Sequence, residues 1–170
     1  MKDAAMALYN KKNEWLASQV DVEFPTSESI KGRALYLDSL TSRFLEPVSL
    51  AESFSAKIEW HLVDFHRLTV MFSLLQSKIW ESEEAQNFIV EYLTQIILDP
   101  EYSLYVGFSE GEAVSAAIMC RENDVVVVSD IVGATASTSH DDIALSLIHE
   151  TLNINSDENS NLVNIWIEKR

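Results

Sequence analysis

Two histidines close to an aspartate are the first residues in this chain that could hold a metal ion. His61 and His66 flank Asp64, and imidazole nitrogens with a carboxylate oxygen are donors that zinc accepts. Two ligands from a strand and its following helix rarely converge without a third, so we expect no metal site. Cys120 is the only cysteine, which excludes an internal disulfide and a cysteine-based zinc site. Its apolar neighbours predict a buried packing role.

Other signatures of catalysis or nucleic-acid binding are missing from the sequence. It contains no Ser-His-Asp elbow, no Walker phosphate loop and no dinucleotide-binding glycine pattern. Glycoside hydrolysis would need two carboxylates facing one another in a cleft, which the sequence does not place. The tryptophans are too scattered to form a base-stacking platform, so we expect burial for Trp15, Trp60, Trp80 and Trp166.

The formal net charge of −15 lies almost entirely in the second half of the 170 residues. Residues 1–78 hold nine Lys and Arg against ten Asp and Glu, whereas residues 79–170 hold three against seventeen. Between Lys78 and Lys169 the only Lys or Arg is Arg121. This field opposes phosphate-bearing ligands and nucleic acid, and it favours a basic protein partner. No apolar run has the length of a membrane span or of a signal segment, so we expect a cytoplasmic protein.

The first 56 residues predict a helical extension. Apolar residues recur at helical intervals over Ala4–Val20 and indicate a surface helix. A connector containing Pro25 leads into a second helical segment, Ile30–Leu45, which Glu46-Pro47 would end. Residues 49–56 are ambiguous.

A sharper pattern begins at Lys57, where alternation over residues 57–62 predicts a strand that runs into a helix. Ser82 is a plausible N-cap for a second helix that Asp99-Pro100 would end. Three apolar runs separated by turns, Leu104–Phe108, Ala113–Cys120 and Val125–Val128, predict an antiparallel meander.

A capping box opens the last predicted helix. Ser139 and Asp142 have the spacing of that motif, and apolar residues follow at helical intervals to Leu152. Residues 153–160 are polar and turn-like. The final strand, Leu162–Ile167, should lie parallel to the Val125 strand, because the helix between them provides a right-handed crossover.

This order of elements resembles the core of the GNAT acyltransferase superfamily over about two thirds of the chain. The resemblance implies an α+β fold with three α/β/α layers and a mixed, mainly antiparallel sheet. Residues 1–56 would be an N-terminal helical extension, and residues 57–170 a core that lacks the family's last helix and strands. In the family, acyl-CoA lies where two parallel strands splay apart, with its pyrophosphate on the N-terminus of the helix that follows.

The loop that binds this pyrophosphate departs from the family pattern, which reads Gln/Arg-x-x-Gly-x-Gly/Ala. The helix register places Ser139-His140-Asp141-Asp142-Ile143-Ala144 on that loop, and only Ala144 fits. Ser139 replaces the usual cation or amide, and Asp142 replaces the first glycine. Asp141 and Asp142 would repel a pyrophosphate at close range.

Carried over by position, the resemblance assigns acetyl-CoA or another acyl-CoA as the cofactor. The positions that would bind it are Val132, Gly133, Ala134, Ser139, His140 and Ala144. Asp130, on the strand beside the groove, would be a general base for an amine nucleophile; the alternative is a solvated residue at a strand end. His140 could equally be an ordinary surface histidine.

Two functions remain open at this stage. The chain is either a divergent N-acyltransferase, which moves an acyl group from acyl-CoA to an amine, or a catalytically inactive binding or interaction module with the same fold. The family's missing strands would leave the Leu162–Ile167 strand with an unpaired edge. Residues 1–56 or another subunit should cover that edge, and the second possibility predicts a homodimer through it.

Overall fold

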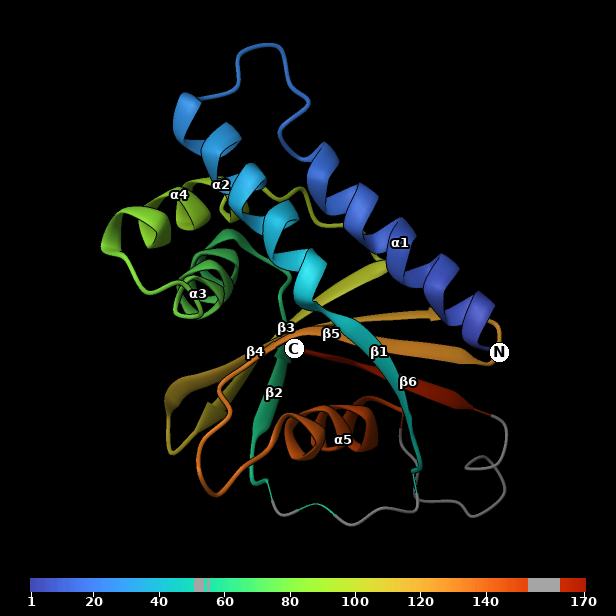
Figure 1. The fold of residues 1–170 in the computed structure, drawn as a ribbon. Coiled ribbons are helices and arrows are strands. Elements are labelled where there is room, and N and C mark those ends of the chain that lie inside the picture. The colour runs from blue at the N-terminus through green and yellow to red at the C-terminus, as the bar shows by residue number, and fades with distance from the viewer. Residues whose placement is uncertain (51–53, 55, 153–162) are drawn as a thin grey trace.

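A six-stranded mixed sheet lies between two layers of helices (Figure 1). The structure is a computed structural model that describes residues 1–50, 54, 56–152 and 163–170. Its strands are β1 Phe44–Val48, β2 Glu59–Leu62, β3 Tyr102–Ser109, β4 Glu112–Glu122, β5 Val125–Val132 and β6 Asn164–Lys169. Its helices are α1 Lys2–Ser18, α2 Ser27–Ser39, α3 His66–Ser77, α4 Glu83–Leu93 and α5 His140–Thr151, with a 3₁₀ turn at Leu40–Ser42. The predicted α+β class with three layers is confirmed.

The strand order is β1-β6-β5-β4-β3-β2. Strands β3, β4 and β5 form the predicted antiparallel meander, and β6 lies parallel to β5 after the α5 crossover. From β2 onward, the described elements follow the order that the family resemblance implies.

The side chains of β5 divide the core between the two faces of the sheet. Val125 and Val127 pack under α1 and α3, whereas Val126 and Val128 pack against α5. Successive strand residues point to opposite faces, so a strand of consecutive valines has to be covered on both sides. On the first face, α2 packs on α4 and forms the outer part of the helical layer.

The first 48 residues belong to the same core as the rest of the chain. Leu8, Leu16 and Leu45 share one apolar cluster with Val125 and Val127. Residues from both sides of the boundary predicted at residue 56 therefore pack together, and the boundary itself stays a prediction.

Strand β1 covers the sheet edge that was expected to be unpaired. It runs antiparallel to β6, with Phe44 opposite Lys169 and Val48 opposite Ile165. Strand β6 is thus bonded on both sides, by β1 and by β5. The edge on which the predicted dimer depended is occupied by the chain's own residues. The oligomeric state remains to be measured.

Two predicted helices end earlier than expected. The second ends at Ser39 instead of Leu45, because Phe44–Val48 pairs with β6 as a strand. Pro47 is tolerated there because β1 lies at the sheet edge. The helix that starts after Ser82 ends at Leu93, well before Asp99-Pro100. Residues 51–53 and 55 of the ambiguous stretch, all of the turn-like stretch 153–160 and Leu162 of the last predicted strand lie outside the described residues.

The local signals at helix starts and at the cysteine are confirmed. Ser82 caps α4 by accepting a hydrogen bond from the N–H of Ala85, and Ser139 and Asp142 form the capping box of α5. Cys120 is buried, and burial raises the pKa of its thiol to about 12. Across the ranges that the structure covers, no helix is both long and apolar enough to cross a bilayer.

Gly32 is where helices α2 and α4 touch backbone to backbone. A Cβ at this position would overlap the carbonyl oxygen of Phe88 and lie 2.6 Å from the Cβ of Tyr92. Glycine is therefore needed here although alanine is the better helix former.

We predict that Gly32→Ala destabilises the protein by about 1–3 kcal/mol, the usual cost of overpacking, measured by urea unfolding. Leu37→Ala, at an exposed position of the same helix, is the control and should change the free energy of unfolding little. A Gly32→Ala protein as stable as the wild type would show that the two helices do not meet at this point.

Candidate functional site

A β-bulge at Asp130 separates β5 from β6. Between Ile118 and Ala116, β4 advances two residues while β5 advances three, from Ser129 to Val132. Asp130 is the bulged residue, with a φ of 54°. The β5–β6 ladder ends at Val128 and Ile167, so the two strands part beyond that point.

Side chains of the protein itself satisfy the backbone groups of this bulge. The N–H of Asp130 donates to Glu168 Oε1 at 3.0 Å, and its carbonyl accepts from Gln76 Nε2 at 2.6 Å. The carbonyl of Ile131 accepts from Arg170 Nη2 at 2.8 Å. These groups are therefore already paired at the point where the strands separate.

The carboxylate of Asp130 is paired with two cations. Its Oδ2 lies 2.5 Å from Lys12 Nζ, and its Oδ1 lies 3.0 Å from Arg43 Nη1. The hydroxyls of Tyr36 and Ser129 donate to the same carboxylate at 2.7 and 2.8 Å. The N-terminal elements thus supply three of its four partners.

Glu168 on β6 completes a buried charge cluster. Arg43 Nη1 lies 3.1 Å from Glu168 Oε1, and the hydroxyl of Tyr9 donates to Oε2 of the same residue. The cluster contains Tyr9, Lys12, Tyr36, Arg43, Asp130 and Glu168. All six residues are buried, and the two cations balance the two carboxylates.

The cluster keeps Asp130 ionised. Burial alone would raise the pKa of this carboxyl, but the charges of Lys12 and Arg43 and the hydrogen bonds from Lys12 and Tyr36 hold it well below its ordinary value. A general base needs a free lone pair that faces the substrate. Asp130 is 1% exposed and both of its oxygens are engaged, so the solvated alternative is wrong and the geometry is that of a counter-ion.

A pocket of about 420 Å³ lies beside the point where the strands part; we call it the splay pocket. Its lining is Leu75, Lys78, Ile79, Val114, Val132, Gly133, Ala134, His140 and Arg170. The structure therefore brings together four of the predicted cofactor positions, Val132, Gly133, Ala134 and His140. The other two do not line the pocket, because Ser139 caps α5 and Ala144 is buried under the sheet.

The polar side chains that line the splay pocket are two cations and an imidazole, and no Asp or Glu side chain lines it. Lys78 comes from the end of α3, His140 from the start of α5, and Arg170 follows β6. The two acids of the α5 first turn are engaged elsewhere, since Asp141 pairs with Lys169 and Asp142 closes the capping box. Among the described residues no carboxylate lies within ion-pair distance of Lys78 or Arg170.

The pKa of His140 is lowered in this pocket. Burial lowers the pKa of its imidazole, and the charges of Arg170 and Lys169 lower it further, although Asp141 and Glu168 act in the opposite direction. The ring is half-buried and uncharged at neutral pH. It can therefore take up a proton when an anion binds beside it.

Several residues of this region were missed in the sequence, and one of them had a readable signal. Lys12 lies three or four residues from Leu8, Tyr9 and Leu16, on the buried stripe of α1. A charged residue inside an apolar stripe predicts a buried partner. Arg43, Glu168, Lys78 and Arg170 had no comparable signal, since their partners are distant in sequence.

The histidine pair considered for a metal shows no such site. On β2, His61 Nε2 lies 3.3 Å from Glu59 Oε1, and His66 is the first residue of α3. The described residues contain no group of three His, Cys, Asp or Glu that could hold a metal ion.

Comparisons with known proteins give one structural neighbour to report. No family model and no curated protein sequence matches the chain. A GCN5-related N-acetyltransferase from Kribbella flavida superposes with a TM-score of 0.41 at 11% identity, over 79% of this chain and 53% of that chain. This chain thus spans about half the length of that structure.

We predict that Asp130→Asn lowers the free energy of unfolding by about 3–5 kcal/mol, because it leaves Lys12 and Arg43 buried with one carboxylate between them. Urea unfolding of Asp130→Asn, Lys12→Met and the double variant measures the coupling between the two residues. The double variant should recover part of the loss. Additive effects would contradict the pairing.

The same variant should show the pH dependence of this pair. The pKa of Asp130 is lowered in the folded state, so its contribution to stability is present above about pH 4, the ordinary pKa of an aspartate. That contribution is lost as pH falls toward the lowered pKa. The stability difference between wild type and Asp130→Asn should therefore narrow below about pH 4, as measured by urea unfolding at each pH.

Proposed function

We propose that this protein is a non-catalytic binding module that holds a small anion, a phosphate or carboxylate group, in the splay pocket. One contrast carries the proposal. The polar groups of the β5 bulge already have partners within the protein, whereas the cations of the splay pocket have no carboxylate partner among the described residues. The paired groups of the bulge leave few free backbone groups for a reacting substrate, and the cations give the pocket a local positive charge that attracts an anion.

The geometry favours binding over acyl transfer for two further reasons. Asp130 is a buried, ion-paired counter-ion, so it does not offer an amine nucleophile a free base. In addition, Ser139 and Asp142 use each other's backbone N–H groups at the start of α5, where the family resemblance would place the pyrophosphate. Those two donors are not free for a phosphate.

Acyl transfer from acetyl-CoA or another acyl-CoA is the second candidate, and one observation favours it. Gly133 and Ala134 line the splay pocket with small side chains directly before α5, and Gly133 has a φ of 106°. Both residues are exposed, so an acyl thioester can reach the backbone there. This candidate requires that the cofactor binds at all, which can be measured directly.

Calorimetric titration with inorganic phosphate, acetate and acetyl-CoA tests both candidates. We predict saturable binding of phosphate or acetate that weakens about tenfold in Lys78→Gln/Arg170→Gln, a loss of about 1.4 kcal/mol. The control, Lys2→Gln/Arg121→Gln, removes the same charge at exposed positions outside the pocket and should bind as the wild type does.

The outcomes separate the two functions. Saturable binding of acetyl-CoA, followed by acyl transfer to an amine, would replace the binding-module proposal with the acyltransferase. No binding of either small anion, or equal losses in both double variants, would overturn the anion site.

Binding of the small anion should tighten as pH falls. An anion beside His140 raises the lowered pKa of that imidazole, so protonation and binding favour each other. The affinity gain should reach up to about tenfold for each unit by which the anion raises the pKa. Titrations with acetate between about pH 8 and pH 6, where acetate keeps its full charge, measure it, and His140→Gln should bind with a flat pH profile. A wild-type profile as flat as that of His140→Gln would remove His140 from the site.

A further inference from the structure

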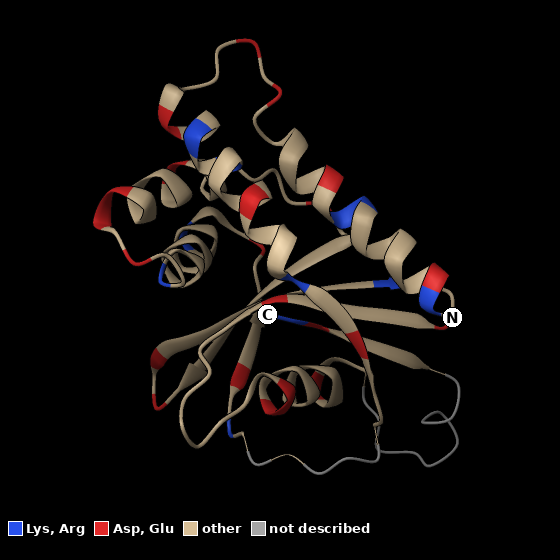
Figure 2. Cartoon of the chain, in the orientation of Figure 1, with Lys and Arg blue, Asp and Glu red and all other residues tan. Residues whose placement is uncertain are grey.

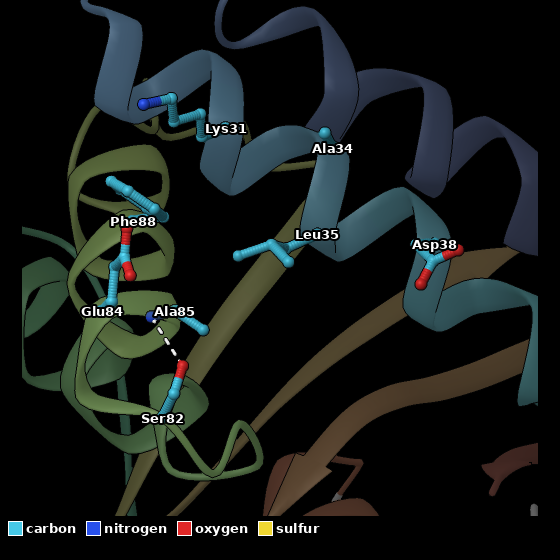
Figure 3. A pocket seen from close by; sticks show the side chains of 8 residues that line it. All are labelled: Lys31, Ala34, Leu35, Asp38, Ser82, Glu84, Ala85 and Phe88. Atoms are coloured by element: carbon cyan, nitrogen blue, oxygen red, sulfur yellow. Dashed lines mark hydrogen bonds between the residues drawn. The ribbon is translucent and has the colours of Figure 1, made fainter.

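A second, larger pocket lies between α2 and α4, away from the splay pocket; we call it the helical groove. Its volume is about 470 Å³, and its lining is Lys31, Ala34, Leu35 and Asp38 from α2, with Ser82, Glu84, Ala85 and Phe88 from α4 and its N-cap (Figure 3). The buried charge cluster and the splay pocket use none of these residues.

The floor of the groove is apolar and continues onto the exposed surface of α2. Ala34, Leu35, Ala85 and Phe88 supply the floor. Ile30 and Leu37 lie four residues before and three after Ala34, so the three share one face of the helix. Ile30 is 42% and Leu37 is 41% exposed. Ala34 lines the groove, so this exposed apolar surface of α2 adjoins it.

The rim of the groove is acidic. Asp38 and Glu84 line it, and Glu81 and Glu83 flank Ser82 at the beginning of α4, where Figure 2 shows acidic residues. These four carboxylates make no ion pair within the part of the chain that the structure describes.

One cation lines the helical groove, and it is held by an aromatic ring. Lys31 Nζ lies 5.1 Å from the centroid of the Phe88 ring. The balance of charge around the groove is therefore negative, with an apolar centre.

We propose that the helical groove docks an amphipathic helix of a partner protein, with an apolar stripe that enters the groove and Lys or Arg on both flanks. The apolar floor provides the contact area, and the acidic rim selects the flanking charges. A second copy of this chain fits poorly, because two copies that met on this face would oppose like charges.

The test uses a fluorescein-labelled synthetic peptide of about 18 residues, about five helical turns, with leucines at i, i+3, i+4 and i+7 and lysines elsewhere. Fluorescence anisotropy measures its binding to the full chain. A second peptide, with glutamate in place of lysine, tests the charge requirement. We expect binding of the lysine peptide, no binding of the glutamate peptide, and amide chemical-shift changes confined to α2 and α4.

Two variants separate docking from general attraction to an acidic protein. Asp38→Lys/Glu84→Lys reverses the rim and should weaken binding of the lysine peptide about tenfold or more. Glu110→Lys/Glu112→Lys makes the same change in net charge at the β3–β4 turn, outside the groove, and should bind as the wild type does apart from a small electrostatic loss. Ala34→Gln fills the floor without a change of charge and should weaken binding by a similar factor.

Several results would overturn the proposal. Equal losses in the two charge-reversed variants would mean that the peptide responds only to net charge. Binding of the glutamate peptide, or no binding of the lysine peptide, would also overturn it. A dimer in solution that Asp38→Lys/Glu84→Lys alters would instead identify a second copy as the occupant. Because none of these substitutions touches the splay pocket, anion binding measured on the same proteins separates failure here from failure of the proposed function.

Discussion

The rest of the structure depends on the ion pairs that Asp130 makes inside the protein. Two charges removed from water cost several kcal/mol each, and their attraction offsets that cost only when the geometry is good and the remaining polar groups are bonded. Asp130 meets both conditions, because Lys12, Arg43, Tyr36 and Ser129 satisfy its carboxylate while Glu168 and Gln76 satisfy its backbone. These contacts hold α1, α2 and Arg43, the residue before β1, against the bulge of β5. They thereby help to place β1 beside β6 as the sixth strand of the sheet.

The same arrangement occupies the backbone groups that the family resemblance would leave open to a cofactor. In the family, the separation of two parallel strands exposes backbone groups to a cofactor. Here the strands also separate, but Glu168, Gln76 and Arg170 bond the exposed groups. What remains beside them is the splay pocket, with its small residues and cations, to which we assign the anion.

Local patterns predicted most of the fold, and distant partners account for what they missed. The valines of β5, the cap at Ser82 and the box at Ser139 are local signals, and each of these elements begins where it was expected. Phe44 and Leu45 were predicted as the end of a helix because the partner of β1, strand β6, lies more than a hundred residues away. A linear charge count likewise does not show that Lys78 and Arg170, at the two ends of the acidic half, line one pocket. Of these charged residues only Lys12, which lies inside an apolar stripe of α1, had a local signal that predicts a buried partner.

The sequence separations within the charge cluster also constrain how the chain can fold during synthesis. Lys12 is 118 residues from Asp130, Arg43 is 125 from Glu168, and Tyr9 is 159 from Glu168. Helices α1 and α2 leave the ribosome early, with a lysine and an arginine whose counter-ions have not yet been translated. Until β6 emerges, these helices have neither their charge partners nor the strand that β1 pairs with. Contacts this distant make folding slow and cooperative. Helices α1 and α2 are therefore made well before β6 but locked in place only after it, and a ribosome-bound chain halted before residue 168 should leave them accessible to proteases.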